Sequence, residues 1–274
     1  MKEPFSVSMC VYGGDNPEWF KIAVESIIHQ TAQPNEVVLV VDGPVPDELN
    51  VVIKSYEQNP IFKIICLTKN QGHGNARRIG LEHCTYELVA LMDADDISAS
   101  DRFEKQLKRF STDNNLTIVG GNIIEFIDSP DHAVGRRNVP GSDSAIKTYM
   151  KKRCPMNQMT VMFKKTEVQA VGGYIDWYCD EDYYLWLRLA LKNAKFANVD
   201  DVLVNVRVGK EMYQRRGGKK YFTSEAKLQK FMLEKKVISF PQYCINVIKR
   251  LIIQVLLPNN LRGWVFQKFA REKA

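Results

Sequence analysis

The sequence lacks the features that define several large classes of protein. Its six cysteines are widely scattered and form no CxxC pair, so we expect neither a disulfide framework nor a zinc site. No uninterrupted apolar run reaches the roughly 18 to 20 residues needed to span a bilayer. The first residues, MKEPFSVSMCVY, do not resemble a signal peptide. These absences favour a reduced, cytosolic, globular protein.

Motifs of the commonest hydrolases and nucleotide-binding enzymes are also missing. The four histidines form no HxxxH or HExxH pattern, which leaves a zinc hydrolase unsupported. No GxSxG or P-loop sequence is present, which removes the commonest serine hydrolases and nucleoside triphosphatases. The glycines at 72, 74 and 80 do not have the GxGxxG spacing of a dinucleotide fingerprint.

The composition is that of an ordinary globular protein with an uneven distribution of charge. The chain has 274 residues, of which 45% are hydrophobic, enough to bury a sizeable core. Acidic clusters lie in the first hundred residues, whereas residues 210–236 and the chain from Lys249 onward are basic. A basic C-terminal region is typical of a protein with an anionic partner, such as a membrane surface or pyrophosphate, and equally of a solvated positive face.

The first hundred residues alternate between strand and helix patterns. Short β-branched or apolar runs predict strands at 5–12, 35–43, 62–68 and 87–93, and helices are predicted at 16–30, 46–58 and 74–84. This order predicts a doubly wound parallel sheet, in which ligands bind beyond the carboxyl ends of the strands. We therefore expect Tyr12 to Asn16, Asp42 with Gly43, and Asp93 to Asp96 to converge on one site.

After residue 100 the alternation weakens. Helices are predicted at 101–110 and 180–193, and a strand at 158–165. Residues 116–127 indicate two strands, or one strand bent at Gly120 and Gly121. Residues 128–145 have the composition of a loop, and the chain becomes helical and basic from about Ser224.

In the segment "LVALMDADD", the apolar run "LVALM" is followed by three carboxylates within four residues. Asp93 and Asp95 are alternate residues of an extended segment, so their side chains point the same way and suit a hard divalent cation such as Mg²⁺ or Mn²⁺. The alternative is that Asp96 or Ser98 caps the helix that begins near Ser100. A helix cap requires only one of the three carboxylates.

Two further segments carry groups suited to catalysis or phosphate binding. Asp180, Glu181 and Asp182 open a predicted helix, where acids favour the helix dipole and where one of them can serve as a general base. In "NQGHGNARR", the glycines permit a tight loop into a helix, and Arg77 and Arg78 supply guanidinium groups that pair with phosphate.

Taken together, these segments resemble the GT-A fold family 2 glycosyltransferases over roughly residues 5–210. The resemblance is carried by "VSMCVYGGDNPEWF", "NEVVLVVDG", "NQGHGNARRIGL", "ELVALMDADDIS" and "DEDYYLWLRL", in that order. It is closest to bacterial enzymes that build O-antigen and exopolysaccharide repeat units. It implies an α/β fold with a mixed, Rossmann-like sheet flanked by helices and a catalytic domain over 1–223 (donor half 1–100, acceptor half 101–223). Beyond the resemblance, apolar stripes mixed with basic residues predict a basic, amphipathic helical tail over 224–274.

The resemblance also implies roles for single residues. On the donor side, Asp42 would contact uracil, the backbone around Cys10 and Tyr12 would line the same pocket, and Arg77 would lie near the base or phosphates. Asp95 would ligate Mn²⁺ or Mg²⁺, and Asp93 would face the ribose or the metal shell. On the acceptor side, Asp182 would be the catalytic base, with Glu181 beside it orienting the acceptor. These are the expected site residues.

The expected reaction is inverting, metal-dependent transfer of a hexose, with galactose or glucose favoured, from a UDP-sugar. The acceptor implied by the resemblance is a sugar on an undecaprenyl diphosphate. The tail would bind the inner face of the cell membrane, the alternative being a helix packed on the catalytic core. No nucleic-acid partner is expected. The alternatives are a sugar-phosphate nucleotidyltransferase and a non-catalytic nucleotide-sugar-binding protein.

One departure from the family pattern concerns the metal shell. Family members often carry a "YRxH" element after the last core strand, but here Arg207 is followed by Gly209 where that histidine would stand. A histidine ligand is therefore not expected, and the donor diphosphate would complete the shell. Residues 209–220 are predicted to form a loop that orders over the donor, with Arg215, Arg216 or Lys219 binding phosphate.

Overall fold

The structure is a computed structural model that describes residues 3–209, 217–258 and 272. The predicted alternation in the first hundred residues is confirmed. The elements are β1 (Phe5–Val11), α1 (Pro17–Ile28), β2 (Glu36–Val41), α2 (Asp47–Ser55), β3 (Phe62–Cys66), α3 (His73–His83) and β4 (Leu88–Met92). All four strands run parallel, in the spatial order β3-β2-β1-β4.

The rest of the chain extends this sheet with strands of both directions. It comprises β5 (Ile97–Ser98), α4 (Arg102–Thr112), β6 (Ile118–Phe126), β7 (Ala133–Arg137), α5 (Asp143–Met150), a 3-10 turn (Gln158–Thr160), β8 (Met162–Lys164), α6 (Lys165–Ala170), α7 (Glu181–Leu191) and β9 (Phe196–Arg207). The order continues β4-β8-β6-β9-β5, with β7 paired to β6. Because β8 is antiparallel to both β4 and β6, the sheet is mixed, as expected.

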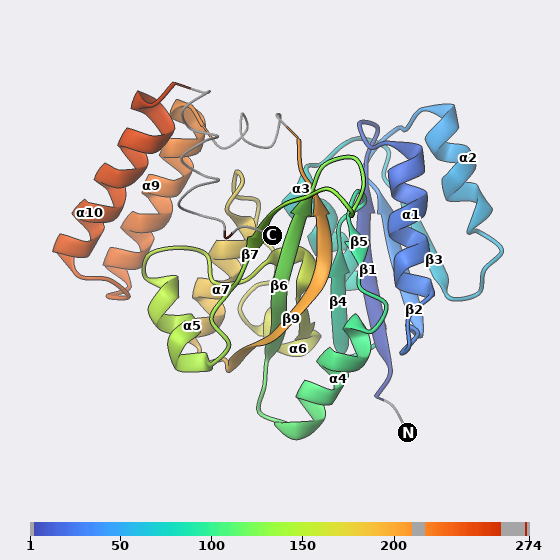
Figure 1. Cartoon of the computed structure of the whole chain (residues 1–274), viewed down its shortest axis with the longest axis horizontal. Helices are drawn as coiled ribbons and strands as arrows, with labels where there is room; N and C mark the ends of the chain where they lie inside the picture. Colours follow the sequence, from blue (N-terminus) through green and yellow to red (C-terminus); the bar gives the residue numbers. More distant parts are fainter. Residues whose placement is uncertain (1–2, 210–216, 259–271, 273–274) are drawn as a thin grey trace.

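Helices cover both faces of the sheet (Figure 1). On one face, α1, α2 and α4 bury side chains such as Phe20, Ile53 and Phe103 against the sheet. On the other face, α3, α5, α7 and α9 (Lys219–Glu234) do the same, with Trp186 at the centre. Successive residues of one strand point to opposite faces, so Leu39 lies in the first core and Val38 in the second. A strand buried on both faces requires the continuous apolar runs seen in the sequence.

Three local predictions were wrong. Residues 128–145 are not one loop, because they contain β7 and the start of α5. Neither Asp96 nor Ser98 caps α4, whose N-cap position is Asp101. The helical region begins at Lys219 rather than at about 224, so α9 crosses the expected boundary of the tail. Residues 118–126 form a single strand, and its pairing with β9 is irregular at Gly121 and Asn122.

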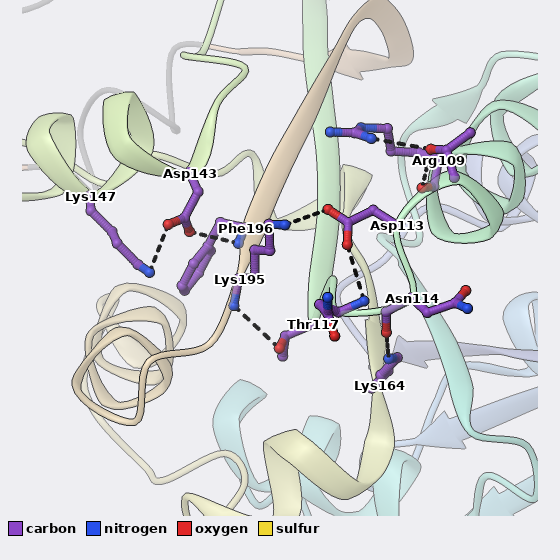
Figure 2. Close-up of polar contacts among 11 residues, drawn as sticks. Arg109, Asp113, Asn114, Thr117, Asp143, Lys147, Lys164, Lys195 and Phe196 are labelled. Atoms are coloured by element: carbon purple, nitrogen blue, oxygen red, sulfur yellow. Dashed lines mark hydrogen bonds and ion pairs between the residues drawn. The ribbon is translucent and has the colours of Figure 1, made fainter.

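Polar contacts fasten the sheet at the edge where β6 and β9 begin (Figure 2). The Lys195 ammonium lies 2.6 Å from the Asp113 carboxylate, and Lys164 Nζ donates to the Asn114 carbonyl at 2.6 Å. Asp143 accepts from the Phe196 backbone N–H at 2.9 Å and pairs with Lys147. These contacts join α4, α5, β8 and β9. The site lies at the other end of these parallel strands, where their carboxyl ends are.

The C-terminal region forms a helical hairpin. Helix α9 packs on the core through Leu228 and Met232, and Ser224 Oγ donates to the Tyr178 carbonyl at 2.6 Å. Helix α10 (Phe240–Leu251) follows and ends in a π-helical turn (Ile252–Leu256). The two helices lie side by side at one end of the molecule (Figure 1).

Candidate active site

The ends of three parallel strands bring the predicted donor-side residues to one edge of the sheet. Strands β1, β2 and β4 end at Val11, Val41 and Met92, and Tyr12, Asp42 and Asp93 follow them directly. The backbone N–H of Asp42 donates to the Val11 carbonyl at 2.7 Å, which fixes β1 and β2 in register at this edge. The predicted convergence of these three residues is therefore confirmed.

Asp42 organises the loop that leads into α3. Its carboxylate is buried and accepts from the backbone N–H groups of Gln71 at 2.7 Å and Gly72 at 3.1 Å. The next residue, Gly43, has a φ of +90°, and a Cβ there would lie 2.5 Å from the Asn70 nitrogen. Glycine is therefore required where the backbone approaches this closely. The carboxylate thus joins the end of β2 to the start of α3.

The two other residues predicted to line the donor pocket differ in exposure. The Tyr12 side chain is 48% exposed, and its backbone N–H donates to Asp15 at 2.9 Å. Cys10 is partly buried, and burial raises the pKa of its thiol to about 12. The Cys10 thiol is therefore neutral at physiological pH and suits a lining surface rather than a nucleophile.

Arg77 and Asp93 form a close ion pair. Nη2 of Arg77 lies 2.6 Å from Oδ1 of Asp93, and the arginine side chain is 3% exposed. Burial alone would raise the pKa of Asp93, but the charge and hydrogen bond of Arg77, with the charge of Arg102, lower it. Asp93 is therefore a carboxylate at neutral pH. The sequence placed Arg77 near this site but did not identify Asp93 as its partner.

The three carboxylates of the "DADD" segment have different surroundings. Asp93 and Asp95 are partly buried, whereas Asp96 is fully buried and accepts from the Arg207 backbone N–H at 2.9 Å. Burial, together with the charges of Asp95 and Asp93, raises the pKa of Asp96 well above its usual range. Arg207 Nε also donates to the Asp95 carbonyl at 3.3 Å. Asp96 therefore serves to join this segment to β9, and not as a helix cap.

The donor set at Asp93 and Asp95 fits a hard divalent cation. Both are oxygen ligands two residues apart, at the end of a strand, and both are partly accessible. Within the described ranges, no three His, Cys, Asp or Glu side chains gather closely enough to hold a metal ion. An ion bound here would therefore draw its remaining ligands from a bound diphosphate or from water.

The second acidic cluster lies where α7 begins. Asp182 Oδ1 accepts from the Tyr183 backbone N–H at 2.6 Å, and the Cys154 thiol lies 3.8 Å from Oδ2. Burial and then the charge of Glu181 raise the pKa of Asp182 to about 6. A carboxyl with this pKa is ionised at neutral pH and is a stronger base than an exposed aspartate. Its environment suits the predicted role of general base.

Asp180 and Glu181 flank this base in opposite protonation states. Burial, followed by the charges of Glu225 and Asp182, raises the pKa of Asp180 to about 9, so this carboxyl is neutral at pH 7. Burial also disfavours the charged form of Glu181, but His73 and Arg77 outweigh it and lower the Glu181 pKa. Glu181 is thus an anion at neutral pH, held next to the proposed base.

Several residues at the site were not identified from the sequence. Arg102 is fully buried behind the "DADD" segment and donates to the Leu91 carbonyl at 2.7 Å, and burial lowers its pKa to about 9. His73 contacts both Arg77 and Glu181. Cys154 faces Asp182. Arg102 lies close in sequence to the acidic "DADD" motif and His73 lies within a glycine-rich motif, and this proximity is the only sequence signal for them. No neighbouring motif indicated Cys154.

Other residues of the family pattern have structural contacts. Trp186 is fully buried in the core, and Arg188 donates to the carbonyls of Val171 and Gly173. Lys219 is the first residue of α9. Arg215 and Arg216, with most of the loop predicted at 209–220, lie outside the described residues, as does the tail over 259–271.

Solved structures with the same architecture define the class of fold. A mannosyltransferase from Pyrobaculum calidifontis in complex with GDP-Man and Mn²⁺ superposes with a TM-score of 0.65 at 16% identity, covering 96% of this chain and 72% of that one. Staphylococcus aureus TarS residues 1–349 in complex with UDP-GlcNAc gives 0.63 at 16% identity, covering 91% and 72%. The fold is the GT-A glycosyltransferase fold, as predicted.

Sequence comparison then identifies the family. The family model "Glycosyl transferase family 2" matches residues 6–166, more than half of the chain. The chain belongs to this family and is a glycosyltransferase, which sets aside the nucleotidyltransferase and non-catalytic alternatives.

Curated relatives cover almost the whole chain. An Escherichia coli protein described as UDP-Gal:alpha-D-GlcNAc-diphosphoundecaprenol beta-1,3-galactosyltransferase is 38% identical, over 97% of this chain and 96% of that protein. The amylovoran biosynthesis glycosyltransferase AmsE of Erwinia amylovora is 34% identical, over 96% and 98%. These relatives confirm the resemblance to enzymes of O-antigen and exopolysaccharide synthesis. Among the described residues, no helix has the length and hydrophobicity required to cross a bilayer.

Proposed function

We propose that this glycosyltransferase moves galactose from UDP-galactose, with inversion and with a divalent metal, to a sugar carried on undecaprenyl diphosphate. The observation that carries the proposal is the pair of acidic clusters with different electrostatics. At one, Asp93 is held ionised beside Arg77, and at the other burial and Glu181 raise the pKa of Asp182 to about 6. The donor and acceptor follow those named for the 38% identical E. coli relative.

The acceptor side of the reaction rests on Asp182. As the acceptor hydroxyl attacks C1 of the donor sugar, Asp182 takes the hydroxyl proton, and the bond from C1 to the diphosphate oxygen breaks. Attack from the side opposite the leaving group inverts C1. Glu181, ionised and fixed beside the base, orients the acceptor.

The donor side rests on the strand ends. Asp42 and the backbone around Cys10 and Tyr12 would hold the uridine, and Asp93 and Asp95 would hold Mn²⁺ or Mg²⁺. A divalent cation held there would supply positive charge to offset that of the departing diphosphate. Arg77 acts here by fixing Asp93, since its guanidinium is buried against that carboxylate.

The exposed face of α10 supports a membrane partner. Apolar side chains at a spacing of three and four residues are exposed along the helix and its π-helical end: Ile245, Ile248, Ile252 and Leu256. On the side turned toward the protein, Tyr243 packs against the core, but the buried side chains are the polar Asn246 and Gln254. Asn246 donates to Gln229 and to the Lys151 carbonyl, and Gln254 donates to Glu225 at 2.8 Å.

This arrangement reverses that of a helix packed on a water-soluble core, which buries its apolar side. An apolar face flanked by Lys249 suits insertion among the headgroups of an anionic bilayer. We assign α10 to the inner surface of the cell membrane, where the lipid-linked acceptor resides.

A transfer assay tests the proposed reaction. The enzyme is incubated with a GlcNAc-diphospho-lipid acceptor and, separately, UDP-galactose, UDP-glucose, UDP-GlcNAc or GDP-mannose, and the product is identified by mass spectrometry. We expect galactose transfer from UDP-galactose that stops with EDTA and returns with Mn²⁺ or Mg²⁺. Transfer that is insensitive to EDTA would contradict the metal assignment, and preference for GDP-mannose would contradict the donor.

A further inference from the structure

A continuous path of polar contacts joins the two acidic clusters. It begins at Asp93, whose carboxylate lies 2.6 Å from Nη2 of Arg77. Arg77 Nε then donates to Nε2 of His73 at 2.9 Å. His73 Nδ1 lies 3.4 Å from Oε1 of Glu181, the neighbour of Asp182. The path therefore runs from the donor half to the first turn of α7 through one imidazole.

The contacts define the protonation of that imidazole. An arginine Nε carries a hydrogen at every accessible pH, so it can only donate. Nε2 of His73 must therefore present its lone pair to Arg77, which leaves the single proton of a neutral imidazole on Nδ1. Nδ1 is the nitrogen that lies 3.4 Å from the Glu181 carboxylate. His73 thus accepts from the donor half and donates toward the acceptor half.

Packing places the two halves within reach of this residue. A Cβ on the neighbouring Gly74 would lie 3.4 Å from Cα of Asp176 and 3.7 Å from Cβ of Glu181. The first turn of α3 is therefore pressed against the segment that leads into α7. Arg77 and Glu181 are both almost fully buried, so both depend on fixed partners for their charges.

We propose that His73 is a positioning residue for the transfer reaction, which fixes the ionised Glu181 beside Asp182 and ties that pair to the Arg77–Asp93 pair. The inference rests on the function proposed above. The proposal adds His73, which the acidic motifs alone do not indicate, to the residues needed for transfer. The "GHG" segment would then act in catalysis through Glu181 rather than by binding phosphate.

The proposal has an electrostatic consequence for the base. The groups that face Asp182 are the acids Glu181 and Asp180, the arginines Arg77 and Arg137, and Cys154 and Tyr174. Those that face Glu181 are His73, Arg77, Asp182 and Tyr174. His73 favours the charged form of Glu181, and that charge raises the pKa of Asp182. Without His73, burial raises the pKa of Glu181, and as Glu181 loses its negative charge the pKa of Asp182 falls.

The test compares two replacements of one residue. H73F keeps a ring but has no polar atom, whereas H73Q keeps one acceptor and one donor. We expect H73F to lower kcat about tenfold, as for loss of a charged hydrogen bond, with KM for the UDP-sugar unchanged. H73Q should recover most of kcat. H83F is the matched control, because His83 lies at the other end of α3, where its ring contacts the Ile79 carbonyl. It should behave as wild type.

The pH profile of kcat separates positioning from a merely structural role. In H73F the acid limb should move to lower pH, and in H73Q it should stay near that of wild type. The double variant H73F/E181Q should be no slower than E181Q alone, because the two residues act as a unit.

Any of three results would overturn the proposal. These are a wild-type kcat in H73F, an equal loss of kcat in H73F and H73Q, and an H73F variant in which only the KM for the UDP-sugar rises. D182N is measured in parallel. If D182N retains transfer, the proposed base is wrong, and if D182N is inactive while H73F is unchanged, only the role of His73 fails.

Discussion

The acidic residues of the site differ in their surroundings more than in their chemistry. Asp93 has a lowered pKa because the charge and hydrogen bond of Arg77 outweigh its burial, and Asp96 has a strongly raised pKa because it is buried beside two other acids. The pKa of Asp182 is raised to about 6 and that of Asp180 to about 9. Each environment thus favours one function: ligand, structural link, base, or neutral buried acid.

Asp180 allows a prediction about stability. Its pKa is about 9 in the folded protein, against an ordinary 3.8. The folded state therefore binds the proton more tightly, so the contribution of Asp180 to stability is complete below pH 4 and is lost as pH rises toward 9. One of its carboxyl oxygens, Oδ2, is also buried with no hydrogen-bond partner among the described residues. D180N cannot ionise, so we expect it to be more stable than wild type at pH 8, by about 1–3 kcal/mol.

Chemical denaturation at pH 4 and pH 8 measures this effect. The two proteins should have similar free energies of unfolding at pH 4, and the difference should appear only at the higher pH. A variant that is less stable than wild type at pH 8 would show that the carboxylate form of Asp180 is the stabilising one.

Local sequence was sufficient to place some of these residues and insufficient for others. Asp42, Asp93 and Asp95 could be located because each follows an apolar run, and parallel strands end at one edge. The partner of Asp96 could not be identified, because Arg207 lies 111 residues away along the chain. The pKa of Asp182 depends on burial, which requires the folded core. The roles assigned to single residues remain predictions.

Among the elements, α10 is distinguished by an apolar face that is turned outward. Asn246 in α10 and Gln254 in the π-helical turn are both below 5% exposure, while Phe240 in α10 and Leu256 in the turn are about two-thirds exposed. The two buried polar side chains have hydrogen-bond partners in Gln229, Glu225 and the Lys151 carbonyl. A bilayer would cover what the protein leaves exposed.

Vesicle binding tests this assignment. The double variant I248E/I252E places two charges on the exposed face, where they oppose insertion among the headgroups. We expect the wild-type protein to sediment with phosphatidylglycerol vesicles and the variant to bind at least about tenfold more weakly. V51E is the matched control, because Val51 is 69% exposed on α2. Equal sedimentation of all three proteins would contradict a membrane role for α10.

The elements that could not be predicted are short or weakly patterned. Strand β7 has the sequence AVGRR and little apolar alternation, so its composition indicated a loop. Helix α5 has eight residues, close to the length at which periodicity is lost. Helix α9 begins with Lys219, Lys220 and Tyr221, which have no capping signal, and its N-cap is a glycine. The longer, amphipathic α1 and α7 were predicted within about two residues.

In the whole molecule, the predicted site residues lie at one end of the parallel strands and the stabilising polar contacts lie at the other. The parallel strands direct their carboxyl ends to the edge that carries Asp42 and Asp93, and the edge where β6 and β9 begin is fastened by contacts such as Asp113 with Lys195 (Figure 2). The insertion of β8 between β4 and β6 could not be predicted, because strand order depends on long-range pairing. The family resemblance indicated only that the sheet is mixed.

The central claim is that Asp182 is the base of a UDP-sugar transferase, and one comparison tests it most directly. D182N and D113N make the same chemical change, at the site and at the opposite edge of the sheet. The measurement is the rate of galactose transfer from saturating UDP-galactose, with the Kd for UDP measured by calorimetry. We predict that D182N loses at least about 100-fold in rate with its Kd unchanged, and that D113N matches wild type in both. Transfer by D182N at more than a tenth of the wild-type rate would contradict the claim.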